Sequence, residues 1–155
     1  MEIRPVESPR QWGEVERLMR AYLDDLPFEI EFQDVDRELA ALPEEYGPPR
    51  GAALLVVDDG GFAVGVVGVR CFDERSAELK RMYVAPEARG MGTGRALGSA
   101  AVAAARDLGY ERLLLDTVAT MTAAIATYMG LGFVEIAPYR HNPLPDARYF
   151  ALELT

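Results

Sequence analysis

The segment from residue 78 to residue 95 constrains the fold most, because it joins an apolar run, a proline and a cluster of glycines. Residues 79–84 are β-prone at their ends, and Pro86 ends the predicted strand because proline cannot donate to a ladder. The alanine-rich residues 96–108 carry apolar side chains at helical spacing. A tight turn is predicted between these two elements, on Gly90, Gly92 and Gly94. The segment thus predicts a strand, a glycine turn and a long helix.

This glycine turn is suited to binding an anion. A turn that leads into a helix offers unpaired backbone N–H groups and the positive end of a dipole, and Arg89 and Arg95 can add charge-assisted bonds. A Walker A loop is excluded because Arg95 follows Gly94 where lysine is required, and the dinucleotide fingerprint lacks its last glycine. An Arg-x-x-Gly-x-Gly pattern at Arg89, Gly92 and Gly94 is what remains. A pyrophosphate loop and a plain structural turn are both open at this point.

Charge and composition narrow the class of protein. The chain has 155 residues, half of them hydrophobic, which predicts one domain over residues 1–155 with a substantial core. A net charge of −9 argues against nucleic-acid partners. Residues 70–95 nevertheless hold six basic and four acidic side chains, a local field that can attract a small anion. One cysteine and one histidine predict no disulfide and no metal site. With no apolar leader or membrane-length stretch, we expect a cytoplasmic protein without a membrane partner.

The remaining segments predict a mixed α/β (α+β) architecture. Ser8 and Gln11 form a candidate capping box at the start of a helix, and residues 58–61 predict a hairpin. Gly65 and Gly68 lie in the second strand of this hairpin, residues 62–71, where they predict a bulge or the close approach of another part of the chain. Further strands are expected at residues 2–6, 52–57, 112–117, 133–136 and 148–154, with helices at 34–42 and 121–131 and a turn-rich link after residue 42. The order predicts an antiparallel N-terminal half and one βαβ crossover.

Two motifs in this order carry a family resemblance. The first is the Arg-x-x-Gly-x-Gly turn, and the second is Ala-x-x-x-Tyr-x-x-x-Gly-Phe over residues 124–133. The chain resembles the GNAT superfamily of N-acetyltransferases. The resemblance implies a sheet of about six to seven strands flanked by helices, with central strands that splay apart. It also implies acetyl-CoA as co-substrate and no metal.

The resemblance further implies roles for individual residues. Tyr128 matches the general acid, and Glu78 matches a position where some members keep a general base. The other readings are a core aromatic for Tyr128 and an ion-pair partner of Arg70 or Arg81 for Glu78. The main chain of Met82, Tyr83 and Val84 would bind pantetheine, and a main-chain N–H there would polarise the thioester. The pyrophosphate would be held by Arg89, Gly90, Gly92, Thr93, Gly94 and Arg95.

The acceptor side is less constrained by the sequence. The resemblance implies that the N-terminal helices and the last loop line it, which makes Tyr22, Phe28, Tyr139 and Arg140 the candidate substrate-binding residues. Arg140 suits a carboxylate. Met121 stands where the family often has an asparagine, and Asp116 is interpreted as a structural residue.

The expected activity is acetyl transfer to a primary amine of a small molecule, by direct attack in a ternary complex. The alternatives are a non-catalytic acyl-CoA-binding regulatory module and an enzyme that acts on a protein or peptide amine. The family resemblance also allows a homodimer.

Overall fold

The structure is a computed structural model that describes residues 1–28 and 32–154. In that part of the chain, seven strands form one mixed sheet in the order β1-β2-β3-β4-β5-β7-β6. The strands are β1 (Glu2–Pro5), β2 (Ala52–Val57), β3 (Ala63–Cys71), β4 (Ser76–Val84), β5 (Arg112–Val118), β6 (Val134–Ile136) and β7 (Ala147–Glu153). The helices are α1 (Pro9–Asp25), α2 (Phe32–Ala40), α3 (Leu42–Tyr46), α4 (Thr93–Asp107) and α5 (Thr122–Gly130), with a 3₁₀ turn over Pro86–Ala88. The predicted mixed α/β sheet is confirmed.

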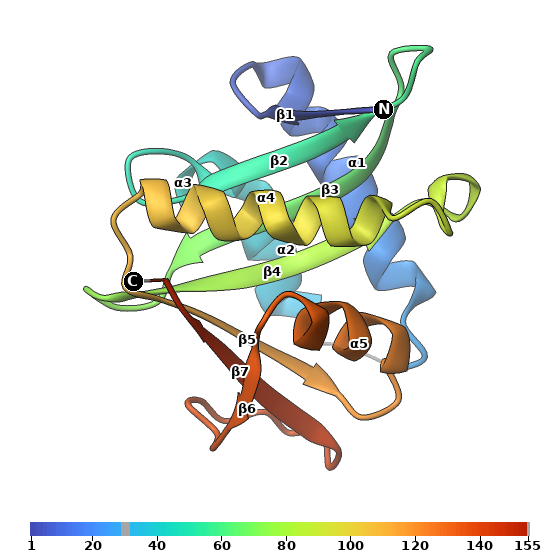
Figure 1. The fold of residues 1–155 in the computed structure, drawn as a ribbon. Coiled ribbons are helices and arrows are strands. Elements are labelled where there is room, and N and C mark those ends of the chain that lie inside the picture. Colours follow the sequence, from blue (N-terminus) through green and yellow to red (C-terminus); the bar gives the residue numbers. More distant parts are fainter. Residues whose placement is uncertain (29–31, 155) are drawn as a thin grey trace.

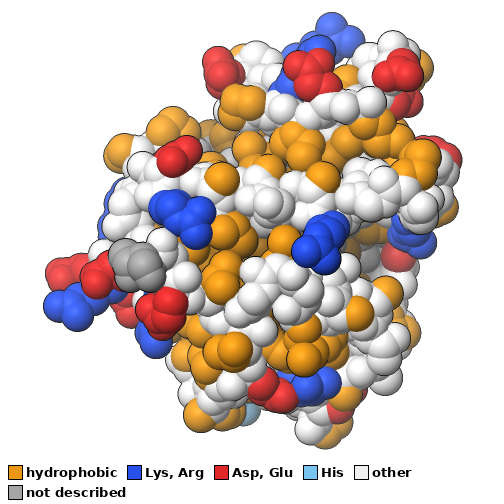
Figure 2. Space-filling model, viewed as in Figure 1, with side chains coloured by type: hydrophobic (Ala, Val, Ile, Leu, Met, Phe, Trp, Pro, Cys, Tyr) orange, Lys and Arg blue, Asp and Glu red, His pale blue; other side chains and the backbone are white. Residues whose placement is uncertain are grey.

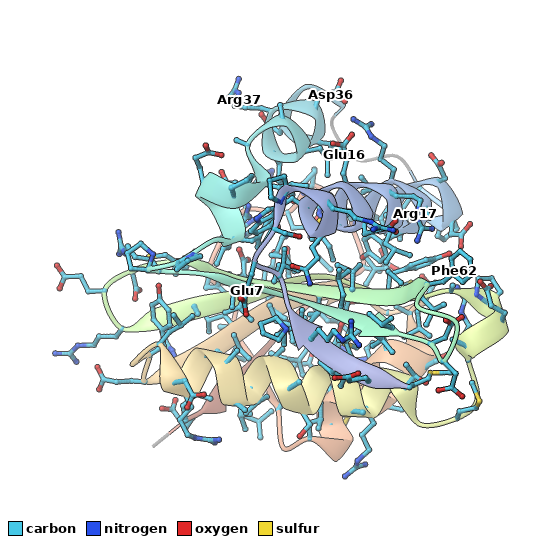
Figure 3. The ribbon with its side chains drawn as sticks, turned by 90° about the horizontal axis from the view of Figure 1, so that it is seen from above. Glu7, Glu16, Arg17, Asp36, Arg37 and Phe62 are labelled. Carbon is cyan, nitrogen blue, oxygen red and sulfur yellow. The ribbon has the colours of Figure 1, made fainter. Side chains whose placement is uncertain are left out.

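Helices cover both faces of the sheet. Helix α1 packs against β3 and β4, and α4 packs against β2, β3 and β4 from the opposite face, as the view from above shows (Figure 3). Their apolar stripes explain this, since Val15, Leu18 and Met19 of α1 are buried, as are Leu97 and Ala101 of α4. The predicted capping box starts α1, where Gln11 N donates to Ser8 Oγ (3.2 Å) and Ser8 N donates to Gln11 Oε1 (2.9 Å).

The central strands splay apart, as expected. Neighbouring strands are antiparallel except β4 and β5, which are parallel and connected through α4. Their pairing covers only residues 76–78 of β4 against residues 112–114 of β5. Beyond Glu78 and Leu114 the two strands separate, and β5, β7, β6 and α5 form one end of the molecule (Figure 1). The splay leaves the edge of β4 open where Lys80, Met82 and Val84 lie.

The sequence pattern does not predict a bulge in β4. Gly68 pairs with Lys80 and Val66 pairs with Tyr83, so β4 carries one more residue than β3 in this interval. Arg81 lies in the bulge with a φ of 59°, in the left-handed region that non-glycine residues rarely adopt. Bulges re-aim side chains, and here the bulge directs Arg81 toward Glu38 of α2.

The segment after α2 differs from its predicted turn-rich link. Prolines and glycine at residues 43–49 indicate irregular structure, yet Leu42–Tyr46 forms helix α3. Pro43 is tolerated because it lies in the first turn, and Leu42 and Tyr46 gain burial. The ring of Tyr46 also explains Gly68, since a Cβ there would lie 2.5 Å from a ring carbon.

Neither a membrane-spanning helix nor a metal-binding cluster is found among the described residues. No helix within residues 1–28 and 32–154 is long and apolar enough to cross a membrane. In the same ranges, no group of three or more histidine, cysteine or acidic residues is arranged to hold a metal ion.

Candidate active site

A cavity of about 620 Å³ lies where β4 and β5 separate. Its walls come from α1, α2, both strands, α5 and the loop between β6 and β7. The lining residues used below are Tyr22, Phe28, Glu38, Arg70, Lys80, Arg81, Met82, Asp116, Met121, Tyr128, Arg140 and Asn142. Three of the four predicted acceptor-side residues, Tyr22, Phe28 and Arg140, therefore meet in one cavity, whereas Tyr139 contacts Glu78.

Tyr128 is positioned on this cavity by α5. The ring is 7% exposed and packs against Phe133 with the ring centroids 5.8 Å apart. Its hydroxyl makes no hydrogen bond to the described residues. Burial raises the pKa of Tyr128, and the neighbouring Tyr22 adds to the rise. The phenol is thus held protonated at neutral pH beside the cavity.

Glu78 is the most enclosed charged residue of the site. The residue is 0% exposed, and its carboxylate accepts hydrogen bonds from Arg140 Nη2 (2.8 Å), Arg70 Nε (3.2 Å) and Tyr139 Oη (2.8 Å). Burial and the charge of Glu78 raise the pKa of Tyr139 and keep it a donor. Both carboxylate oxygens are therefore engaged, and Arg140 is turned toward Glu78. Of the two sequence-based partners of Glu78, the structure places Arg70 beside it.

A second buried ion pair attaches α2 to the bulge of β4. Arg81 donates to Glu38 through Nη2 (2.9 Å) and Nε (3.2 Å), and Tyr46 Oη donates to the same carboxylate (2.7 Å). Burial opposes ionisation of Glu38, but Arg81 outweighs it and lowers the pKa of the carboxyl group. The pair fixes the wall of the cavity that α2 supplies.

Lys80 and Asp116 face each other where the strands begin to separate. They follow the last paired residues, Glu78 and Leu114, by two positions on each strand. Lys80 Nζ lies 3.7 Å from Asp116 Oδ1, and the other oxygen of Asp116 accepts from Asn142 Nδ2 (3.1 Å). Burial lowers the pKa of Lys80, although the charges of Glu78 and Asp116 oppose this. Asp116, interpreted from the sequence as structural, lines the cavity.

The glycine turn precedes α4, as predicted. Gly90 and Gly92 have φ angles of 82° and 75°, and Gly92 is the N-cap of α4. A Cβ placed on Gly90, Gly92 or Gly94 would meet nothing within 4 Å, so the space over the turn is open. The N–H groups of the first helical turn have no intrahelical acceptors, because the first such bond is Ala96 N to Gly92 O (3.0 Å). The turn therefore offers unpaired N–H donors beside open space.

The other predicted cofactor contacts are divided between this turn and the core. Arg89 donates to Val84 O (2.8 Å), and Arg95 donates to Gly130 O (3.2 Å). Thr93 Oγ1 donates to Ala88 O (3.1 Å), which braces the turn. The side chain of Tyr83 is buried and donates to Asp25 (2.9 Å), so only its main chain is available to a ligand. On the face that carries α4, basic side chains stand apart with hydrophobic atoms between them (Figure 2).

Sequence reasoning did not identify Lys80 or Glu38 as site residues. Lys80 had a detectable signal, because it alternates with Glu78 and Met82 along a predicted strand. Glu38 had none, since its contact with Arg81 depends on the bulge.

Comparison with known proteins finds a family model and a relative that each match most of this chain. The model of the acetyltransferase (GNAT) family matches residues 15–133. An uncharacterized N-acetyltransferase of Schizosaccharomyces pombe is 37% identical over 154 residues, which covers 99% of this chain and 94% of that protein.

Solved structures share the fold. A GNAT-family acetyltransferase from Staphylococcus aureus Mu50 superposes with a TM-score of 0.81 at 20% identity, over 99% of this chain and 100% of the other. A protein from Salmonella typhimurium, solved with its cofactor acetyl-CoA, gives a TM-score of 0.72 at 20% identity, over 100% of this chain and 94% of the other.

Proposed function

Because the chain belongs to the acetyltransferase (GNAT) family, we propose that it transfers the acetyl group of acetyl-CoA to a primary amine of a small molecule, by direct attack of the amine in a ternary complex. The main support for this proposal is the cavity of about 620 Å³, which lies beside Tyr128 and beside the open edge of β4. Its volume is typical of small-molecule sites. Walls on several sides favour a small amine over an extended peptide.

The residues present fit acetyl-CoA. The open space over Gly90, Gly92 and Gly94, together with the free N–H groups of α4, suits a pyrophosphate. The unpaired edge of β4 at Met82 and Val84 can hydrogen-bond an extended pantetheine arm in the manner of an added strand. Acetyl-CoA supplies the activated acetyl group.

Tyr128 is the proposed general acid. The amine nitrogen forms a bond to the acetyl carbon, the carbon–sulfur bond breaks, and Tyr128 gives its phenol proton to the departing sulfur. The amine releases a proton to solvent, and the phenolate is reprotonated from solvent. Tyr128 carries its proton at neutral pH, because the ordinary tyrosine pKa of about 10 already lies above 7 and burial raises the pKa of Tyr128 further.

Glu78 as general base stays a prediction. Its three hydrogen bonds support a second role, in which the carboxylate holds in place Tyr139 and the cavity-lining Arg140. The two roles differ in their consequences for stability and for the pH dependence of kcat.

The test is thiol release from acetyl-CoA with a panel of amines, for the wild type and Tyr128→Phe. We expect amine-dependent release, with kcat at least tenfold lower in Tyr128→Phe. Tyr110→Phe is the matched control, because Tyr110 donates to Arg50 O away from the cavity and its variant is expected to keep wild-type activity. Unchanged kcat in Tyr128→Phe would exclude the acid role. Acetyl-CoA binding without amine-dependent release would refute the transferase and favour a binding module.

A further inference from the structure

The charged side chains around the cavity are not equally satisfied. Arg81 bonds Glu38, Arg70 bonds Glu45 (3.3 Å) and Glu78, and Arg140 bonds Glu78. These guanidinium groups are hydrogen-bonded to carboxylates, although Arg140 Nε has no hydrogen-bond partner among the described residues. Arg140, which the sequence suggested as a carboxylate clamp, is among them.

Lys80 differs from these arginines, because its ion pair with Asp116 includes no hydrogen bond. Its side chain is 13% exposed and lines the cavity. Nζ makes no hydrogen bond to residues 1–28 or 34–154, and its ion-pair partner Asp116 Oδ1 is 3.7 Å away. An ammonium group carries three donors and is costly to bury without acceptors. Lys80 is therefore a cation whose hydrogen-bonding capacity remains for a ligand. Arg37, the other lining cation without a hydrogen bond in those residues, is exposed on the outer side of α2 (Figure 3).

Asp116 completes a pair of opposite charges on the same cavity. Its backbone position lies opposite Lys80 where the strands separate, and Asn142 orients its carboxylate. The separation of 3.7 Å is longer than a hydrogen bond, so a ligand can take both partners without breaking a tight contact. A ligand that bears a carboxylate next to an ammonium group presents the complementary arrangement of charges.

We propose that Lys80 and Asp116 bind the acceptor as a zwitterion, which makes the acceptor of this enzyme a free amino acid. Lys80 holds the carboxylate and Asp116 holds the amino group, on the cavity that also contains Tyr128. The inference rests on the proposed acetyltransferase function. The bound ammonium group gives one proton to solvent before it attacks, because only the neutral amine is a nucleophile.

The test compares acids with their amides. Wild type is assayed with the twenty amino acids and the corresponding amino-acid amides, in which the carboxylate becomes a neutral carboxamide. For the best acceptor we expect kcat/KM to be at least tenfold higher for the acid than for the amide. In Lys80→Met, kcat/KM for the acid falls about 10- to 100-fold, mostly through KM, which is the range for loss of a hydrogen bond to a charged group. The variant then no longer prefers the acid.

Two controls separate this result from misfolding. Arg20→Met removes a cation that pairs with Glu16 on the exposed face of α1, and its acid preference is expected to remain. Thermal unfolding and acetyl-CoA binding of Lys80→Met are measured in parallel. The melting temperature and the acetyl-CoA affinity of Lys80→Met show whether the variant is folded.

The outcomes distinguish the two proposals. If wild type acetylates amides or simple amines as well as acids, the zwitterion site is wrong and the transferase function stands. A Lys80→Met variant that keeps the acid preference also overturns the site. A second measurement does not depend on turnover: calorimetric titration of the CoA complex with the same amino acids. Binding that Lys80→Met abolishes supports the site, whereas absent or unaffected binding refutes it.

Discussion

Replacing Glu78 by glutamine removes the charge that two guanidinium groups share. The side chain of Glu78 is 1% exposed, and those of Arg70 and Arg140 are 19% and 30% exposed. Breaking a buried ion pair by removing one partner costs about 3–5 kcal/mol. Arg140 is partly hydrated and Arg70 keeps Glu45, so the lower end applies. We expect Glu78→Gln to lose about 3 kcal/mol of unfolding free energy, or roughly 6–12 °C in Tm for a chain of this size.

Urea unfolding measures this loss, and Glu45→Gln is the matched control. Glu45 contacts the same Arg70 (3.3 Å), but its side chain is 40% exposed, so its loss is expected to stay below about 1 kcal/mol. Equal, small losses in the two variants would refute the reasoning from burial. The pH profile of kcat then tests the base role separately. A general base produces an acidic limb that disappears in Glu78→Gln, whereas a purely positioning carboxylate leaves the shape of the profile unchanged.

Two further predictions address the turn and the buried lysine. Gly92→Ala is expected to lose about 1–2 kcal/mol of stability, because φ is 75° there, and to bind acetyl-CoA more weakly by calorimetry. Gly13→Ala, in α1 with nothing within 4 Å of the new Cβ, should instead gain about 0.5–1 kcal/mol, and a Gly92→Ala variant as stable as wild type would contradict the strain argument. The pKa of Lys80 is lowered by burial, so between the folded pKa and the ordinary value of about 10.4 the unfolded chain binds more protons. The difference in unfolding free energy between the wild type and Lys80→Met should therefore increase in favour of the wild type as pH rises through this window. Urea titrations at several pH values measure this difference, and a difference that does not change with pH would show that Lys80 is not desolvated.

Local patterns were sufficient for most of the elements. The capping box of Ser8, the glycine turn before α4 and the strand at residues 79–84 depend on neighbours within a few positions, and each is found. Helix α3 was not predicted, because the burial of Leu42 and Tyr46 against distant residues outweighs the local signal of proline and glycine. The sequence also offers the acidic residues Glu29 and Glu31 to a cationic acceptor, and both lie outside the described residues.

The sequence by itself determined the class of fold, the glycine turn before α4 and the family, because these depend on residue spacing that survives in a linear pattern. The tertiary structure decided which charges are available to a ligand. Arg140 and Lys80 are both cations that line the cavity, yet Arg140 is bonded to Glu78 whereas Lys80 makes no hydrogen bond to residues 1–28 or 34–154. That difference arises from contacts between residues far apart in the chain, since Arg140 meets Glu78 whereas Lys80 meets Asp116. Electrostatic pairing depends on distance and burial in space, and neither quantity can be read from spacing along the chain.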